Sequence, residues 1–355
     1  MKMFTKLALV SSMAISANAM AMQSMDDAAL SATTGQDGIN IGLGISKVTI
    51  EKVLVHDNDG LVYSGTAPTA GQAGFGGTGN DGAIVIKGNG ISGDTNETNG
   101  IVISTNAAAL LPSHNLADIV IDTEAGAGGG NTAFLNVAAK VSGLNIAIGE
   151  IGVAASNSVG TGPGIRRGAT DTAYTAANTT GNYNKILSGL TLTTGQMNAN
   201  VQLGAAPQGA MIKLNTTMTG GLTITNLGIF DASSRGSTVG YTAGTDNILG
   251  TADDVAVTST TDGEIRIDSI KLADASGSDL TVQADIRVVG ESTAGANNGY
   301  LSINTMKTAS DIYIKGVHLG SATAGSIGDI EVQGLNVYNG AGGANAGAII
   351  KISGH

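Results

Sequence analysis

The chain of 355 residues contains no cysteine and no tryptophan, has only four prolines, and is charged at only 13% of its positions. Without cysteine, disulfide bonds, Cys/His metal centres and thiol catalysis are excluded. The formal net charge is −11, and no run of Lys or Arg forms a basic stripe that could neutralise nucleic-acid phosphates. The composition therefore argues against a nucleic-acid partner.

Residue types that carry catalysis are also scarce or scattered. The four histidines are dispersed, and none stands in a Ser-His-Asp order or a metal-ligand spacing. The glycine-rich runs lack the Lys-Ser/Thr of a phosphate-binding loop. A β-helical polysaccharide-cleaving enzyme would need aromatic sugar platforms, and the chain has only seven Tyr and four Phe. We therefore expect a protein without enzymatic activity.

What the chain has in abundance is glycine, at 54 residues, together with Ile, Val, Leu, Thr and Ala. A disordered chain is charged and poor in branched residues, so this composition predicts a folded protein. Short aliphatic segments alternate with stretches rich in Gly, Asn and Thr. This arrangement is typical of many short strands joined by turns, and it predicts an all-β fold.

The first 21 residues have the three-part layout of a secretory signal peptide. Lys2 and Lys6 precede an apolar run from Leu7 to Ile15, and cleavage is expected after Ala19 or Ala21. The run is too short to span a bilayer, and no later segment approaches the necessary length. We therefore expect export across the inner membrane, with the mature chain at the cell surface, outside the cell or in the periplasm, and without a transmembrane segment.

An eight-residue phrase recurs along the chain, with aliphatic residues at positions one, three, six and eight. Residues two apart on a strand share a face, so each half of the phrase directs two side chains the same way. Positions three and six are three apart, so the second half would point to the opposite face unless the two residues between them bend the chain. These two residues are of types that tolerate a corner or bulge, such as Lys-Gly. The copies are VTIEKVLV from Val48, IAIGEIGV from Ile146, LTITNLGI from Leu222, IRIDSIKL from Ile265, IYIKGVHL from Ile312 and IEVQGLNV from Ile330, with a looser LSINTMKT from Leu301.

Two architectures satisfy this phrase. In an irregular β-solenoid or β-prism-like stack, each copy is two short strands around a corner with all four aliphatic side chains pointing inward. The return from Ile312 to Ile330 would then be one coil stacking on the next. In a β-sandwich, each copy is one longer strand buried on both faces. The long polar stretches Ser64–Asp81, Ala125–Asn131, Ser156–Asn184 and Asp231–Asp262 are expected to be loops in either case.

Two acidic loops are candidates for a cation. HDNDG places Asp57, Asn58 and Asp59 before Gly60. The second loop, GTDNILGTADDV, contains three aspartates and one asparagine. We predict that these four side chains are calcium ligands, because calcium prefers several oxygens on flexible loops. Ordinary turn chemistry, in which Asp and Asn bond their own backbone, explains the same residues without a metal. No other cofactor is expected. The candidate ligands are Asp246, Asn247, Asp253 and Asp254.

The two ends of the chain carry a family resemblance. The stretch MDDAALSATTGQDGINI, which begins at Met25, and the terminal IIKISGH resemble those of pilus-system (Fil-type) exported proteins of Gram-negative bacteria. The resemblance covers about a tenth of the chain. It implies a cell-surface or fibre-associated role and supplies no catalytic residues. The sequence therefore divides into three segments: the signal peptide 1–21, a short motif segment 22–38 and a β-rich repeat-like domain 39–355.

Two hypotheses of function follow. The first is a structural or adhesive component of a surface pilus or fibre, whose partners are other subunits or the assembly machinery. The alternative is a soluble secreted or periplasmic binding module that displays its loops. Ile39–Ile45 and Ala348–Ser353 are short apolar strands near the termini, and each could complete a neighbouring subunit by β-strand addition.

Overall fold

The computed structural model describes residues 38–354, apart from positions 64, 129, 160–161, 174–179, 219, 234, 236–237, 260 and 297. The predicted signal peptide and almost all of the 22–38 segment lie outside these residues, as does His355. Nearly every described element is a β-strand, which confirms the all-β prediction. In the described part of the chain the only helices are the three-residue η1 (Ala107–Ala109) and η2 (Ala341–Gly343), so none has the length needed to cross a bilayer.

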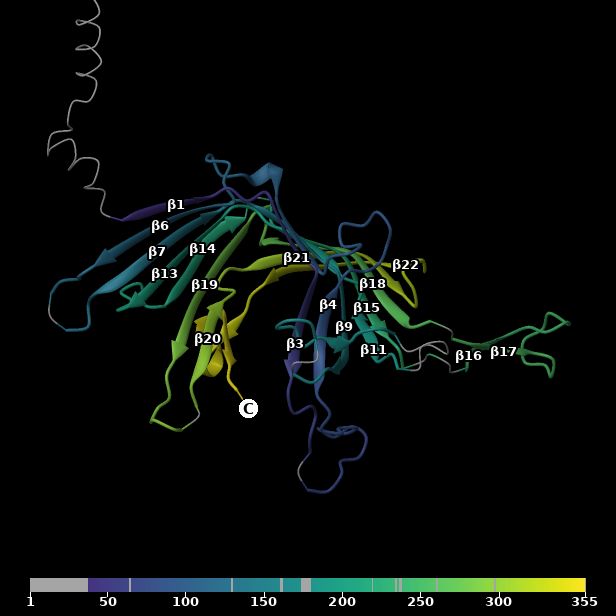
Figure 1. Ribbon diagram of the computed structural model, residues 1–355. Coiled ribbons are helices and arrows are strands. Elements are labelled where there is room, and N and C mark those ends of the chain that lie inside the picture. The colour runs from purple at the N-terminus through teal and green to yellow at the C-terminus, as the bar shows by residue number, and fades with distance from the viewer. Residues whose placement is uncertain are drawn as a thin grey trace, which may run out of the picture.

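The strands form a three-sided arch (Figure 1), with two walls and a roof. The first wall is an eight-stranded antiparallel sheet. In spatial order its strands are β1 (Ile39–Leu43), β6 (Ala117–Glu124), β7 (Phe134–Val141), β13 (Met197–Gly204), β14 (Ile212–Met218), β19 (Leu280–Val289), β20 (Tyr300–Thr305) and β25 (Ala348–Ile352).

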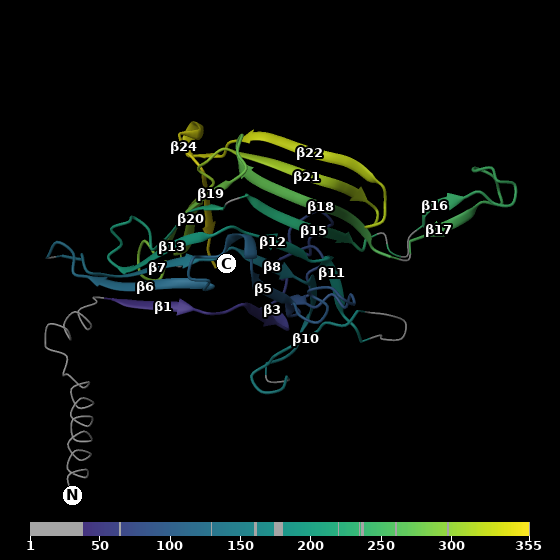
Figure 2. The same cartoon turned by 90° about the horizontal axis from the view of Figure 1, so that it is seen from above.

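The roof and the second wall belong to one thirteen-stranded sheet that bends along a corner, and Figure 2 looks onto the roof from above. The roof contains β2 (Lys47–Ile50), β5 (Ile101–Thr105), β8 (Leu144–Ile148) and β12 (Leu190–Thr193). The second wall contains β3 (Lys52–Asp57), β4 (Gly82–Lys87), β9 (Glu150–Ser156), β11 (Tyr183–Leu187) and the short β10 (Ala169–Thr170). Four strands continue from roof into wall: β15 (Leu222–Asp231), β18 (Gly263–Asp274), β21 (Ser310–Leu319) and β22 (Ser326–Leu335).

The chain builds this arch in eight passes. We call a pass one crossing of the first wall, the roof and the second wall, in either direction. The first pass is β1, β2 and β3, the second returns through β4, β5 and β6, and the alternation continues to the eighth, which is β22 and β25. Every pairing between neighbouring passes is antiparallel, as in a meander.

The bent strand pairs occur as the phrase predicts. In LTITNLGI the corner residue is Asn226, whose φ of 62° reverses the alternation. Leu222 and Ile224 therefore lie on the inner face of the roof, and Leu227 and Ile229 on the inner face of the second wall. The copies that begin at Val48, Ile146, Ile265 and Ile312 bend at the same corner.

The coil that the solenoid alternative expects between Ile312 and Ile330 does not form. The segments IYIKGVHL and IEVQGLNV are the two arms of an antiparallel hairpin, in which Ile314 pairs with Ile330 and Ile312 with Val332. A solenoid coil would place Ile312 beside Ile330 in parallel. The same phrase serves both arrangements because the inward-facing positions are unchanged when a strand is reversed.

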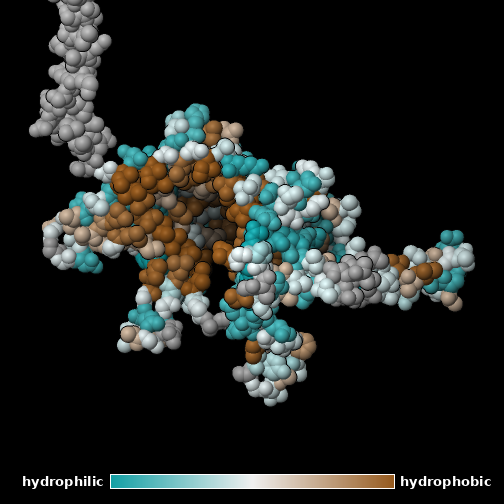
Figure 3. Space-filling model, viewed as in Figure 1, coloured by the Kyte–Doolittle hydropathy of each residue, from teal (hydrophilic) through white to brown (hydrophobic). Residues whose placement is uncertain are grey.

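The inner faces carry continuous aliphatic ladders, which surround a hollow (Figure 3). The ladder of the first wall has one member from each of its eight strands. It consists of Ile39, Ile121, Val137, Val201, Ile212, Ile286, Ile303 and Ile350. The ladder of the roof consists of Val48, Ile103, Ile146, Leu192, Ile224, Ile270, Ile314 and Ile330.

Most predicted polar loops lie at the free rims of the arch. The connections β3–β4 and β9–β11 lie at the rim of the second wall, and β6–β7 at the rim of the first. The β15–β18 connection contains the hairpin of β16 (Thr238–Thr242) and β17 (Val255–Thr258), which projects from the body as an arm. A small hairpin of β23 (Tyr338–Asn339) and β24 (Asn345–Ala346) precedes β25.

The corner between first wall and roof is closed by buried polar contacts. The Ser142 hydroxyl, which is fully buried, donates to the carbonyl of Asn115 at 2.6 Å and accepts from the amide of Leu111 at 3.0 Å. The Thr194 hydroxyl accepts from the Leu144 amide at 3.0 Å. These hydroxyls satisfy backbone groups that the sheet ladder leaves unpaired where the chain changes direction.

Candidate functional site

The two end passes are the candidate site. In the eight-stranded sheet β1 pairs only with β6 and β25 only with β20, so the two strands are its opposite edges. In the thirteen-stranded sheet, β2 and β3 of the first pass are edge strands at one side, and β22 of the last pass is the edge strand at the other. Among the described residues no strand pairs with the outer side of either end pass. Both ends therefore present rows of backbone amide and carbonyl groups that can accept another strand.

Large aliphatic side chains are exposed at both ends. On the first pass these include Ile39 at 58% and Val55 at 58% of full exposure. On the last pass Ile350 and Ile352, which are members of inner rows, are also exposed. In the first-wall ladder the members between Ile39 and Ile350 are half-buried because a neighbouring strand covers each side. The greater exposure of Ile39 and Ile350 therefore reflects the neighbouring strand that each of them lacks.

Protection against strand addition is weakest at β1, whereas the other edge strands carry charged residues such as Lys47, Glu331 and Lys351. Natural edge strands are commonly protected by proline or by charged side chains. All four prolines lie outside strands, and β1 has no charged residue. On β22, Asp329 is turned back into its own sheet, since it accepts from the Tyr313 hydroxyl at 2.5 Å and the Gly316 amide at 2.8 Å. The same two bonds hold the pKa of Asp329 below its usual value.

The four predicted calcium ligands meet at the tip of the arm, but as turn residues. Asp253 accepts from the hydroxyls of Thr245 and Thr251, both at 2.8 Å. Asp246 caps the Ile248 amide at 2.9 Å, and Asp254 accepts from the Gly250 amide at 2.6 Å. Asn247 has a φ of 57°, as a turn requires. In the part of the chain that the structure describes, no group of three or more acidic or His residues is arranged to hold a metal ion, so these contacts do not support the calcium prediction.

The turn contacts at the arm predict a local response to acid. The Thr251 hydroxyl, followed by that of Thr245, lowers the pKa of Asp253 to about 2. A carboxylate whose folded pKa lies below its unfolded value of about 3.9 stabilises the fold above that value, and its contribution is lost as the pH falls toward 2. We expect amide protection in the arm to fall between pH 4 and 2, and Asp253→Asn to flatten this dependence. Hydrogen-exchange protection factors of the arm amides measure this loss, and the amides of β19 serve as the internal control. Equal pH profiles in the wild type and in Asp253→Asn would contradict the prediction.

The second acidic loop is held by the protein's own side chains. The Asp59 amide donates to Asp57 Oδ1 at 3.4 Å, and Arg167 donates to Asn58 Oδ1 at 2.5 Å. Arg167 also bonds Asp81 at 2.7 Å across the loop. The loop is therefore fixed to the β9–β10 connection.

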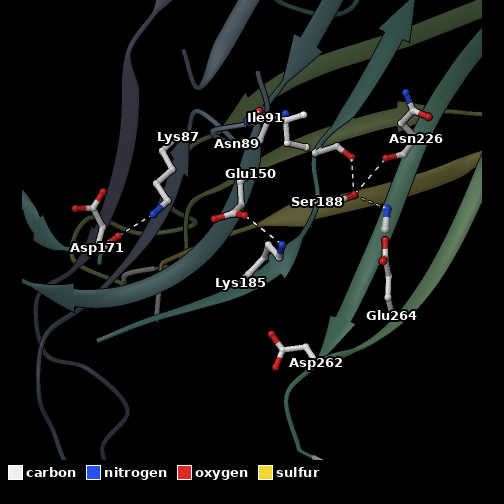
Figure 4. Close-up of polar contacts among 12 residues, drawn as sticks. Lys87, Asn89, Ile91, Glu150, Asp171, Lys185, Ser188, Asn226, Asp262 and Glu264 are labelled. Atoms are coloured by element: carbon white, nitrogen blue, oxygen red, sulfur yellow. Dashed lines mark hydrogen bonds and ion pairs between the residues drawn. The ribbon is translucent and has the colours of Figure 1, made fainter. Parts of the chain in front are cut away.

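The outer face of the second wall carries a cluster of charged residues that sequence reasoning missed (Figure 4). Lys185 lies 3.3 Å from Glu150, and Lys87 donates to the Asp171 carbonyl at 2.7 Å. The Lys87 ammonium also lies 3.7 Å from the centroid of the Tyr183 ring. Burial, with the Glu150 charge nearby, raises the pKa of Tyr183. Each charge thus has a partner, and the cluster fastens the β10 segment to the wall.

One serine–histidine contact also has no sequence signal, because its residues are 100 positions apart. His56 Nδ1 lies 2.6 Å from Ser156 Oγ. The described residues place no carboxylate on the other ring nitrogen of His56, so the pair lacks the third member of a catalytic triad. His318 bonds the Ala324 carbonyl through Nδ1 at 2.6 Å and lies 3.4 Å from Asp268.

Comparison with known proteins adds one partial match. A family model described as a family of unknown function, DUF6160, matches residues 1–105. Within the described residues this range covers the first pass and extends to the end of β5. No curated protein and no solved structure matches the chain.

Proposed function

We propose that the chain is an exported structural or adhesive component of a cell-surface pilus or fibre, and that it has no catalytic role. The observation that carries this proposal is the pair of unpaired end passes, which expose strand edges and aliphatic side chains at both ends of one sheet system. A monomer that functions alone normally protects such edges, whereas a fibre subunit uses them. The signal-peptide pattern and the resemblance of both termini to pilus-system proteins support the same proposal.

The experiment compares cells with and without the protein by imaging their surface and measuring adhesion. A matched pair of variants makes the test specific. Ile39→Lys places a charge on the edge strand β1, and Val62→Lys makes the same change in the β3–β4 loop at a similar exposure, 58% against 62%. We expect Ile39→Lys to reduce surface fibres strongly and Val62→Lys to leave them unchanged. Cells that lack the protein but keep the same fibres and adhesion would refute the proposal.

A secreted or periplasmic binding module is the second candidate, favoured by the hollow of the arch. The apolar ladders face an open space (Figure 3), and members near the rim such as Ile84 and Val153 are exposed. An apolar ligand would cover these side chains. A protein that stays monomeric, leaves the cell surface unchanged and copurifies with such a ligand would establish this alternative.

A further inference from the structure

We propose that copies of this chain associate head to tail through their end passes, so that the eighth pass of one copy pairs with the first pass of the next. This inference rests on the proposed function of a fibre subunit and names its partner, a second copy of the chain. It follows from the direction of the passes, from the order of residues along the ladders, and from the charges at the two ends.

The number of passes decides how two copies can meet. Eight is even, so the first pass runs from first wall to second wall and the last pass runs the opposite way. When a second copy is displaced along the stack in the same orientation, its first pass lies antiparallel to the last pass of its neighbour. Neighbouring passes within one chain also pair antiparallel. An odd number of passes would have produced a parallel joint.

The same wall is continued on both sides of such a joint. β25 meets the β1 of the next copy, and both are five-residue strands of the first wall. Because Ile350 and Ile39 are the two ends of one inner ladder, the joint places them opposite each other and the ladder continues without a break. In the roof, Ile330 comes beside Val48 of the next copy. The joint thereby covers the exposed Ile39, Ile330 and Ile350.

The outer face of the joint is complementary in charge. On the outer face of the roof, one row of cross-strand neighbours begins at Lys47 on β2 and ends at Glu331 on β22. Both are exposed, and among the described residues no ion pair joins Lys47 to another side chain. Head-to-tail contact places this Lys opposite this Glu, which is a favourable cross-strand pair. A head-to-tail contact between copies displaced along the stack in the same orientation does not close into a ring, so it generates a fibre.

Cysteine cross-linking tests the joint directly, because the chain has no cysteine of its own. On the outer row of the first wall, Asn40 and Ile349 are the two end members, so the joint makes them direct neighbours. Seven strand spacings of about 4.8 Å separate them within one chain by about 34 Å, which excludes an intramolecular disulfide. We expect the double variant Asn40→Cys/Ile349→Cys of the full exported protein to give a ladder of multimers on oxidation. Each single variant should give no cross-link, and a mixture of the two only dimers.

A charge exchange provides a second measurement that needs no oxidation. Lys47→Glu should lower the mass of assemblies seen by light scattering, and Lys47→Glu/Glu331→Lys should restore it; failure of the exchange to restore assembly would count against the register. Circular dichroism confirms that each variant is folded. A folded double-cysteine variant that stays monomeric on oxidation, or single variants that dimerise, would overturn the inference. If fibres disappear from cells that lack the protein yet no cross-link forms, the joint is wrong while the proposed function stands; if both results are negative, both fail.

Discussion

Replacing Gly152 by Val is expected to lower the free energy of unfolding by about 3 kcal/mol. Gly152 lies on β9, and a Cβ atom built there would be 2.5 Å from two carbons of the Tyr183 ring and from the Asn184 carbonyl oxygen. The carbonyl cannot yield, because Asn184 is paired with Val153 in the sheet. The ring would therefore have to leave its site.

The cost is large because Tyr183 belongs to a cluster of buried side chains. The ring is 7% exposed and packs with Ala83, Val85 and Ala154, of which Val85 is fully buried. Moving the ring removes this packing and the contact with the Lys87 ammonium.

Gly82→Val is the matched control. Gly82 belongs to the neighbouring strand β4 and pairs with Ala155 of β9, but its Cβ position has no atom within 4 Å. We expect this change to alter the free energy of unfolding by no more than about 0.5 kcal/mol. Urea denaturation followed by circular dichroism measures both variants. Equal midpoints for the two variants would show that a side chain at position 152 does not displace the Tyr183 ring.

Asn226→Val is expected to destabilise the corner of the arch by about 2–3 kcal/mol. Asn226 is the only residue of β15 with a positive φ, and a β-branched side chain is strongly disfavoured there. The change also removes the bond from Arg266 Nη2 to Asn226 Oδ1, which is 3.1 Å long. Ser188 bridges the same corner, since its hydroxyl donates to the Asn226 carbonyl and accepts from the Gly228 amide at 2.9 Å (Figure 4).

Asn226→Gly separates the two contributions. Glycine adopts the positive φ without strain, so this variant loses mainly the side-chain bond, at about 1 kcal/mol. We expect the order of stability wild type, Asn226→Gly, Asn226→Val in urea denaturation. If Val were tolerated as well as Gly, the left-handed conformation would not be what bends the strand, and the corner would depend on its polar contacts alone.

The candidate site was partly accessible from sequence. The aliphatic pattern predicts apolar strands near the termini at Ile39–Ile45 and Ala348–Ser353, and β1 and β25 do form the two edges of the eight-stranded sheet. The edges at β3 and β22 could not be foreseen, because an edge is defined by the neighbour a strand lacks. The Ser156–His56 contact and the Tyr183 cluster join residues that are far apart in the chain, and no local pattern records such pairs.

The sequence alone determined that this protein is built of short strands bent in pairs, because aliphatic spacing sets which side chains share a face, and residues such as Asn226 permit the bend. It also determined where the long loops fall, since Gly, Asn and Thr interrupt the aliphatic pattern there. Only the tertiary structure decided that successive passes run in opposite directions and leave the arch open. The inward positions of a strand are the same in either direction, so periodicity cannot distinguish a coil from a meander; backbone hydrogen bonding between passes makes that choice.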